Sequence, residues 1–221
     1  MTLQETLDRM KTEFEAGRFP LKPTDEQLRI MERATDDLIA SGQADRALGV
    51  GDTAPDFELM DSEGALLRSA DLLANGPVVL SFYRGVWCPY CNMELQALEA
   101  ARPDIEKRGA RLIAISPQTA ANSRKSRRDN KLNFPILSDP AAGLADDFGL
   151  RFTLPDDLIT VYKSFGNDLP QINDTAGWVL PMPARYIIGT DGVIVYAEVN
   201  PDYTQRPDPS ELLPVLDRLR G

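Results

Sequence analysis

Residues 77–91 read PVVLSFYRGVWCPYC, a continuous apolar run followed by a short loop and a Cys-x-x-Cys motif. An apolar run without alternating polar residues is typical of a strand that is buried on both faces of a sheet. Pro89 directly follows Cys88, and proline is favoured at the first position of a helix because its missing N–H would have no partner there. The stretch therefore predicts a buried strand and then a long helix that begins at Cys88 and kinks at Pro103.

Cys88 and Cys91 are the candidate catalytic residues. The unpaired N–H groups at the start of a helix, and the positive end of its dipole, stabilise a thiolate at Cys88. Cys91 lies one turn further along and within reach, so the two thiols can close a disulfide. A lower thiol pKa raises the thiolate fraction and makes that sulfur a better leaving group in exchange reactions. Two inert thiols, or half of a zinc site with unusual carboxylate ligands, are the alternatives, and we expect neither a metal nor a cofactor.

The composition excludes several other kinds of chemistry. The chain has 221 residues, a formal net charge of −10, two cysteines and no histidine. Without histidine, Ser-His-Asp and Cys-His hydrolases and His-ligated haem are excluded. A net negative charge disfavours nucleic acid as a partner. The N-terminus lacks the apolar core of a signal peptide, and no apolar run is long enough for a membrane helix, so we expect a cytoplasmic protein with no membrane partner.

The remainder of the chain alternates strands and helices from residue 49 onward. Short strands are expected at 56–59 and 65–68, and longer or buried strands at 112–115, 135–137, 185–188 and 193–199, with helices at 119–130, 141–148 and 210–220. Strand–helix–strand units that end in a hairpin and a helix predict a three-layer α/β/α fold with a mixed sheet. Residues 49–221 are therefore expected to form the main domain.

Residues 1–48 are expected to form an N-terminal helical extension. Apolar residues recur at helical spacing from Leu3 to Phe14 and again from Leu28 to Leu38, and Thr24 with Gln27 forms a capping-box pattern between them. An apolar helix face seeks cover. The two helices either pack on the main domain or form an arm that binds a second copy or another partner, and a homodimer through these helices or a sheet edge is one such assembly.

Five segments resemble the peroxiredoxin superfamily, of the alkyl hydroperoxide reductase and thiol-specific antioxidant type. In order along the chain they are Gly51–Leu59, Phe82–Tyr83, Leu137–Pro140, Phe148–Leu150 and Glu198–Asp202. The resemblance covers about residues 49–220 and leaves the N-terminal helices outside it. It implies a thioredoxin-like fold, reduction of hydrogen peroxide or alkyl hydroperoxides by a cysteine, and recycling by thioredoxin or a glutathione-type thiol.

The active-site motif departs from the family pattern of proline, threonine and peroxidatic cysteine. Arg84 stands where that proline would be, Cys88 at the threonine and Cys91 at the peroxidatic cysteine. The family's later arginine falls at Pro183, so Arg84 or Arg185 would be the cation that stabilises the thiolate and the leaving oxygen. A Cys-x-x-Cys motif facing a proline resembles thioredoxins, and the Cys-Pro-Tyr-Cys quartet is that of glutaredoxins.

These departures leave three functions open. A peroxidase would use Cys91 to attack the peroxide and Cys88 to resolve the sulfenic acid. A disulfide oxidoreductase of thioredoxin or glutaredoxin type would instead attack a disulfide substrate with Cys88 and resolve with Cys91. A redox-switched binding protein would change its partner according to the state of the pair. Under the thioredoxin resemblance, Pro183 is predicted to be cis and to line the substrate groove; a trans proline at the start of a strand is the alternative. Trp87 either flanks this groove as an apolar platform or is a partly buried core residue.

Two further segments carry weaker signals. Residues 124–131 contain a basic run, which is either a solvated helix face or a docking patch for an acidic reductase or anionic substrate. Residues 151–182 are rich in aromatic side chains, which either wall the mouth of the active site or pack under a loop.

Overall fold

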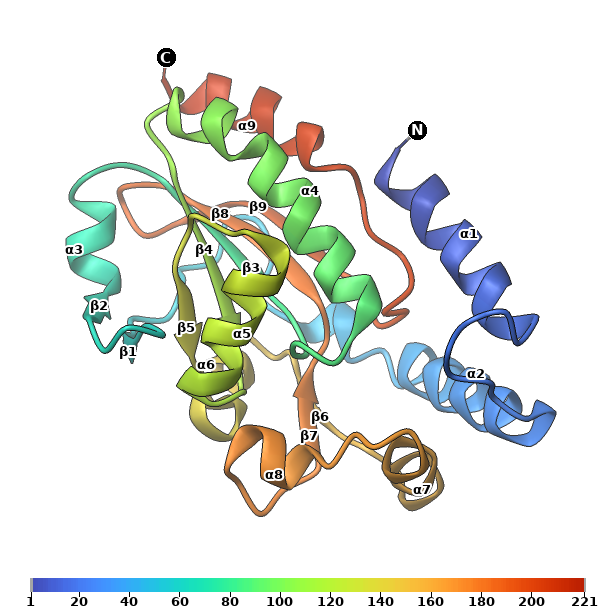
Figure 1. The fold of residues 1–221 in the computed structure, drawn as a ribbon. Helices are drawn as coiled ribbons and strands as arrows, with labels where there is room; N and C mark the ends of the chain where they lie inside the picture. Colours follow the sequence, from blue (N-terminus) through green and yellow to red (C-terminus); the bar gives the residue numbers. More distant parts are fainter. Residues whose placement is uncertain (1, 221) are drawn as a thin grey trace.

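A computed structural model describes residues 2–220, and its centre is a five-stranded mixed sheet (Figure 1). The strand order is β5-β4-β3-β8-β9. The parallel strands are β3 (Val78–Phe82), β4 (Arg111–Ser116) and β5 (Ile136–Ser138), and the antiparallel strands are β8 (Ala184–Ile188) and β9 (Ile194–Val199). The predicted thioredoxin-like α/β/α fold with a mixed sheet is confirmed.

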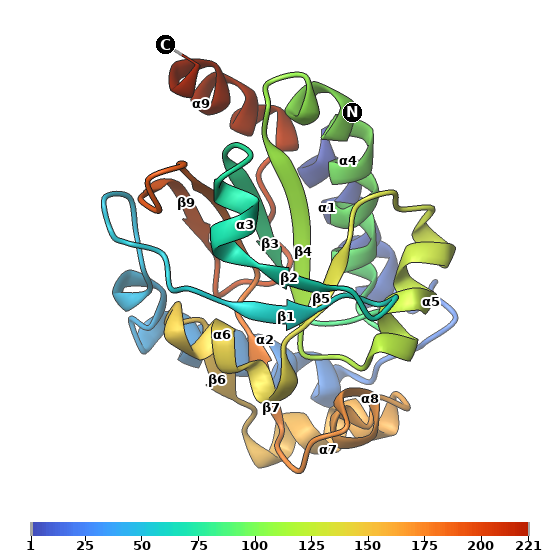
Figure 2. The same cartoon turned by 90° about the vertical axis from the view of Figure 1, so that its left-hand side faces the viewer.

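Helices cover both faces of this sheet (Figures 1 and 2). One face carries α4 (Pro89–Glu106), α5 (Ala120–Asn130) and α9 (Leu212–Leu219), and α4 continues through Pro103 to its end. The other face carries α3 (Ser69–Leu73), α6 (Gly143–Asp147) and the hairpin of β1 (Glu58–Met60) and β2 (Leu66–Arg68). Short 3-10 turns lie at Ala44–Arg46, Pro140–Ala142 and Pro209–Glu211.

The central strand β3 supplies side chains to two hydrophobic cores. Val79 points into the core beneath α4, together with Tyr83 just beyond the strand, whereas Val78, Leu80 and Phe82 point into the core beneath α3 and α6. Since successive side chains of a strand alternate between faces, an unbroken apolar run is what a strand between two cores requires. The run ends at Tyr83, so the loop with the cysteines emerges at the carboxyl end of the sheet.

Residues 151–182 form a separate lobe below the sheet. Its elements are β6 (Arg151–Thr153), α7 (Asp156–Ser164), α8 (Leu169–Asn173) and β7 (Val179–Pro181), which pairs antiparallel with β6. A small third core, built around Leu158, Tyr162 and Leu169, holds it together. The sequence predicts neither strands nor helices in this segment.

The N-terminal extension consists of α1 (Leu3–Glu15) and α2 (Asp25–Ala40), each begun by a complete capping box. Helix α1 buries Leu3, Leu7 and Met10 in the core beneath α4. Helix α2 instead lies against α7 and has no fully buried residue. Both helices therefore pack on the domain of their own chain. None of the helices in the described part of the chain is long and apolar enough to cross a membrane.

Candidate active site

Cys88 and Cys91 sit where β3 gives way to α4. Cys88 is the N-cap of α4, Pro89 is its first residue, and the Cys88 sulfur accepts a hydrogen bond from the Cys91 amide at 3.4 Å. Both sulfurs belong to fully buried residues, and both thiols are free. The local sequence thus produces the predicted helix-start geometry, in which a backbone N–H points at the first cysteine.

Arg84 is the charged group that contacts this sulfur. Its Nη2 lies 3.1 Å from Cys88 Sγ, and its Nη1 donates to the hydroxyl of Tyr162 at 2.9 Å. The guanidinium also stacks over the ring of Tyr203, 3.8 Å from the ring centroid. Arg84 is buried, so its charge acts on the sulfur with little screening by solvent. A buried cation beside a thiol favours the thiolate.

The surroundings shift the pKa values of the two thiols in opposite directions. Burial raises the pKa of Cys88, but a hydrogen bond from the Cys91 thiol, the charge of Arg84 and further hydrogen bonds lower it to about 5. Burial raises the pKa of Cys91 well above its usual value, and the neighbouring Cys88 thiolate raises it further. These opposite shifts favour a thiolate at Cys88 and a protonated thiol at Cys91.

Arg185, the other arginine that the sequence nominated, lies in a buried charge cluster behind α4. Its Nε is 3.3 Å from Glu94 Oε1 and 3.8 Å from Glu198 Oε2. Arg206 completes the cluster, since its Nε donates to Glu94 Oε2 at 2.6 Å. Of the two candidate cations, Arg84 is the one that contacts a sulfur. The Arg185 cluster instead ties α4, which carries Cys91, to β8, β9 and the C-terminal loop.

Pro183 lines a cavity together with Arg84, and its peptide bond is trans. The cis prediction was wrong, since residues 2–220 contain no cis peptide bond. Pro183 directly precedes β8, and its carbonyl accepts a hydrogen bond from Asn200 at 3.1 Å. At this position a trans proline is tolerated, because no strand partner needs the missing N–H.

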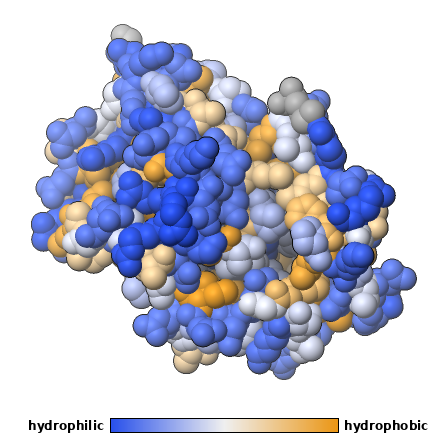
Figure 3. All heavy atoms as spheres, in the orientation of Figure 1, coloured by the Kyte–Doolittle hydropathy of each residue, from blue (hydrophilic) through white to orange (hydrophobic). Residues whose placement is uncertain are grey.

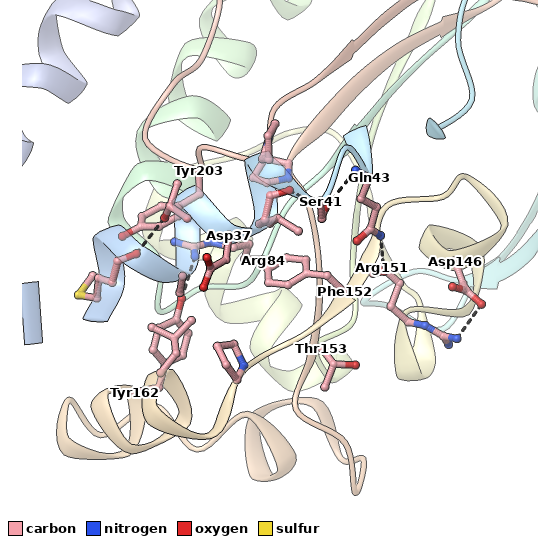
Figure 4. Close-up of a pocket in the computed structure, with 18 residues that line it drawn as sticks. Asp37, Ser41, Gln43, Arg84, Asp146, Arg151, Phe152, Thr153, Tyr162 and Tyr203 are labelled. Atoms are coloured by element: carbon pink, nitrogen blue, oxygen red, sulfur yellow. Dashed lines mark hydrogen bonds and ion pairs between the residues drawn. The ribbon is translucent and has the colours of Figure 1, made fainter. Parts of the chain in front are cut away.

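Two cavities meet at Arg84. The larger one, of about 540 Å³, runs from Arg84 and Pro183 along α2 to the Asp146–Arg151 ion pair (Figure 4). The smaller one, of about 300 Å³, lies on the α1 side and includes Trp87. Tyr162 and Tyr203 line both cavities with Arg84, so the three side chains stand between the cavities.

The predicted aromatic wall is present in part. Phe152 and Tyr162 line the larger cavity, and Tyr162 and Phe165 line the smaller one. Trp178 instead packs in the third core and carries Lys163 over its ring at 5.3 Å. Trp87 packs against Tyr162, with ring centroids 5.3 Å apart, and lines the smaller cavity, while its role as a platform for substrate stays a prediction.

The basic run on α5 is tied to neighbouring groups. Arg124 donates to the carbonyl of Ser62, Arg127 pairs with Glu63, and Lys125 pairs with Asp129. These contacts fit the solvated-face interpretation, whereas a docking role for residues 124–131 stays a prediction.

Sequence reasoning missed Tyr203, Glu94 and Arg206. Tyr203 follows the Glu198–Asp202 segment, and only the tertiary structure brings its ring against Arg84. Glu94 lies one turn beyond Cys91 on α4, at a position that faces the protein interior. The one sequence signal for this cluster was Glu94 itself, a charged residue on the otherwise apolar face of α4. A buried carboxylate needs a buried cation as its partner, so such a residue predicts a buried ion pair.

Comparisons with known proteins identify a family and a fold. The model of the AhpC/TSA family matches residues 50–197. The 1-Cys peroxiredoxin PER1 of Hordeum vulgare is 28% identical over 179 residues, which are 78% of this chain and 73% of that protein. The putative peroxiredoxin bcp of Helicobacter pylori is 33% identical over 147 residues, 66% of this chain and 85% of that protein.

Solved structures show the same fold. Peroxidoxin BcpB from Mycobacterium tuberculosis superposes with a TM-score of 0.62 at 24% identity, covering 79% of this chain and 99% of that one. A cysteine-to-serine mutant of the peroxiredoxin 6 of Arenicola marina gives a TM-score of 0.60 at 26% identity, with 78% of this chain and 74% of that one covered.

Proposed function

This chain belongs to the AhpC/TSA family and is a thiol-dependent peroxidase, and from that premise we propose that Cys88 attacks the peroxide and Cys91 resolves the product. The observation that carries the proposal is the contact between Arg84 Nη2 and Cys88 Sγ at 3.1 Å. The thiolate is the nucleophilic form of cysteine. Alignment with the family motif favours Cys91 as the attacking residue, but Cys91 is the protonated member of the pair because its pKa is raised.

In the first step the Cys88 thiolate attacks the terminal oxygen of the hydroperoxide. The O–O bond breaks, Cys88 becomes a sulfenic acid, and the departing alkoxide or hydroxide takes a proton from solvent. Arg84 stabilises both the thiolate and the negative charge that develops on the leaving oxygen. Its Nε is buried and donates to no acceptor within the described residues, so this donor is available to a peroxide oxygen.

In the second step Cys91 attacks the sulfenic sulfur. An S–S bond forms, the S–O bond breaks, and the sulfenic hydroxyl leaves as water with the Cys91 proton. The short spacing supports this step, because the Cys91 amide already contacts the Cys88 sulfur. Two equivalents of an external thiol then reduce the disulfide and leave as their own disulfide. We propose a thioredoxin-type or glutathione-type donor for this role, and the cytoplasm as the compartment that supplies it.

Disulfide exchange is the second candidate function. The low pKa of Cys88, about 5, favours it as the leaving group in exchange as well as the nucleophile toward peroxide. In both functions Cys88 attacks first, so the two functions differ in the substrate that Cys88 attacks, a peroxide or a disulfide.

Stopped-flow oxidation by hydrogen peroxide tests the proposal in the wild type, Cys88→Ser and Cys91→Ser. Cys88→Ser should lose rapid oxidation, whereas Cys91→Ser should keep it and accumulate a sulfenic acid at residue 88, trapped with dimedone and located by mass spectrometry. The reverse pattern would assign the attack to Cys91. Slow oxidation of all three, with rapid reduction of a disulfide such as oxidised insulin, would favour the exchange function.

A further inference from the structure

The N-terminal extension forms one wall of the smaller cavity beside Arg84. This wall comes from Met10 and Phe14 of α1, Phe19 and Leu21 of the connecting loop, and Met31 of α2. All of these residues lie before residue 50, where the match to the family model begins. In Figure 3, apolar side chains gather around a hollow between the N-terminal helices and the body of the domain.

The opposite wall belongs to the active site itself. Trp87, Pro89 and Tyr90 line it, and these residues flank Cys88 in the sequence. Phe14 packs edge-on against Phe165, which directly follows α7, with ring centroids 6.3 Å apart, so the extension closes the cavity against the lower lobe. The lining is thus mostly aromatic and aliphatic, as is typical of a site for an apolar group.

Arg84 connects this cavity to the reacting sulfur. It lines the cavity, and the same guanidinium lies 3.1 Å from Cys88 Sγ. A ligand whose apolar part fills the cavity would therefore place a polar end group beside Arg84. Hydrogen peroxide has no apolar part, so the apolar lining of the cavity would not contribute to its binding.

We propose that this cavity binds the aromatic or branched alkyl group of an organic hydroperoxide, and that the N-terminal extension is thereby a specificity determinant of the enzyme. The proposal rests on the peroxidase function above. The volume of about 300 Å³ suits one aromatic ring with a short branched substituent, such as the cumyl group, rather than a long lipid chain.

The reaction in this cavity follows the steps given above. The Cys88 thiolate attacks the terminal oxygen, the O–O bond breaks, and the arylalkoxide leaves beside Arg84 and is protonated by solvent to the alcohol. The alcohol keeps the apolar group and lacks the reactive oxygen. It is therefore a non-reacting probe of the cavity.

Binding is tested first, without turnover. The chain has two tryptophans, Trp87 and Trp178, so the Trp178→Phe variant reports on Trp87 alone. Titration of this reduced protein with 2-phenyl-2-propanol should give a saturable change in fluorescence. In the same background Leu21→Phe, which fills part of the cavity, should weaken the binding. Absence of a saturable change would overturn the proposal.

Turnover is tested second, as the ratio of kcat/KM for cumene hydroperoxide to that for hydrogen peroxide. Phe14→Ala and Leu21→Phe should each lower this ratio about tenfold, the size expected when a small apolar contact with substrate is changed. Ile39→Ala is the matched control, because Ile39 is an exposed apolar residue of the same extension outside this cavity. Circular dichroism checks that each variant is folded, and Leu21→Phe removes no core contact.

The two measurements separate the inference from the function it rests on. An unchanged ratio in both variants, with normal hydrogen peroxide turnover, would overturn the cavity as a substrate site and leave the peroxidase function standing. Saturable alcohol binding without turnover of either hydroperoxide would support the binding site and overturn the peroxidase function.

Discussion

The guanidinium of Arg84 donates to the sulfur of Cys88 at 3.1 Å while its face rests on the ring of Tyr203 at 3.8 Å. The acceptors of Arg84 in the described part of the chain are this sulfur and the Tyr162 hydroxyl, and neither is a carboxylate. Since a buried cation requires compensation, the Cys88 thiolate is its natural counter-ion. Arg84 and Cys88 therefore stabilise each other's charged forms.

The acidity of Cys88 should depend on Arg84. The ultraviolet absorbance of the thiolate, followed against pH, should show a midpoint near the pKa of about 5. Arg84→Met removes the charge and one hydrogen bond while the Cys91 contacts remain, so the midpoint should rise by about 1–3 pH units. Arg128→Met, which replaces an exposed arginine, is the control and should leave the midpoint unchanged. An unaltered midpoint in Arg84→Met would show that the Cys91 hydrogen bonds set the acidity without Arg84.

Glu94 should be essential for stability. Its carboxylate is 3% exposed and pairs with both Arg185 and Arg206, so Glu94→Gln leaves two buried cations without their shared anion. Loss of one partner of a buried ion pair costs about 3–5 kcal/mol. The free energy of unfolding in urea measures this loss. Glu58→Gln, which breaks the exposed pair with Arg68, should cost less than about 1 kcal/mol. Equal effects of the two substitutions would contradict the role assigned to the buried cluster.

Glu198 should make stability depend on pH. Burial raises its pKa to about 7, although Arg185 opposes the shift. The folded protein then holds a proton that the unfolded chain releases at about pH 4.3. This contribution to stability is therefore fully present below about pH 4 and is lost as the pH rises through 7. Between pH 5 and pH 8 the free energy of unfolding of the wild type should fall by about 1–3 kcal/mol more than that of Glu198→Gln. Parallel stability curves for the two proteins between pH 5 and 8 would refute this.

Gly85 should resist replacement by alanine. Its φ is +151°, and a Cβ would lie 2.6 Å from Nε1 of Trp87, which is held against Tyr162. Gly85→Ala should cost about 1–3 kcal/mol more than Gly64→Ala, since Gly64 also has a positive φ but open space around it. Urea unfolding measures both costs, and Trp87 fluorescence should change in Gly85→Ala. If the two variants unfold alike, Trp87 is free to move.

Several features could be predicted from neighbouring residues alone. The apolar run 78–82 specifies a strand between two cores, and Pro89 after Cys88 specifies where α4 begins. The helix start then aims the Cys91 amide at the Cys88 sulfur, because these groups are three residues apart in one turn. Periodicity likewise predicted α1 and α2, and the Thr24 capping box predicted the start of α2.

Other features needed contacts between distant segments. Tyr162 and Tyr203 contact Arg84 although they lie far from it in the sequence. No spacing between these residues could have predicted the contacts. The cis prediction for Pro183 failed because it was based on a resemblance, whereas the geometry depends on how the chain enters β8 from β7. No strand or helix was predicted at 151–182, where a short strand pair and two helices are held together by a third core that includes residues of α2.

The sequence by itself determined an α/β fold without histidine in which a pair of cysteines opens a helix after a buried strand. It left the order of the two cysteines open, because a helix terminus favours Cys88 while the family motif favours Cys91. Only the tertiary structure supports one order, since it buries both sulfurs and brings Arg84 to Cys88. Burial and a nearby charge shift the pKa of a thiol by amounts that depend on the distances between atoms in the fold. The spacing of residues along the sequence does not give these distances.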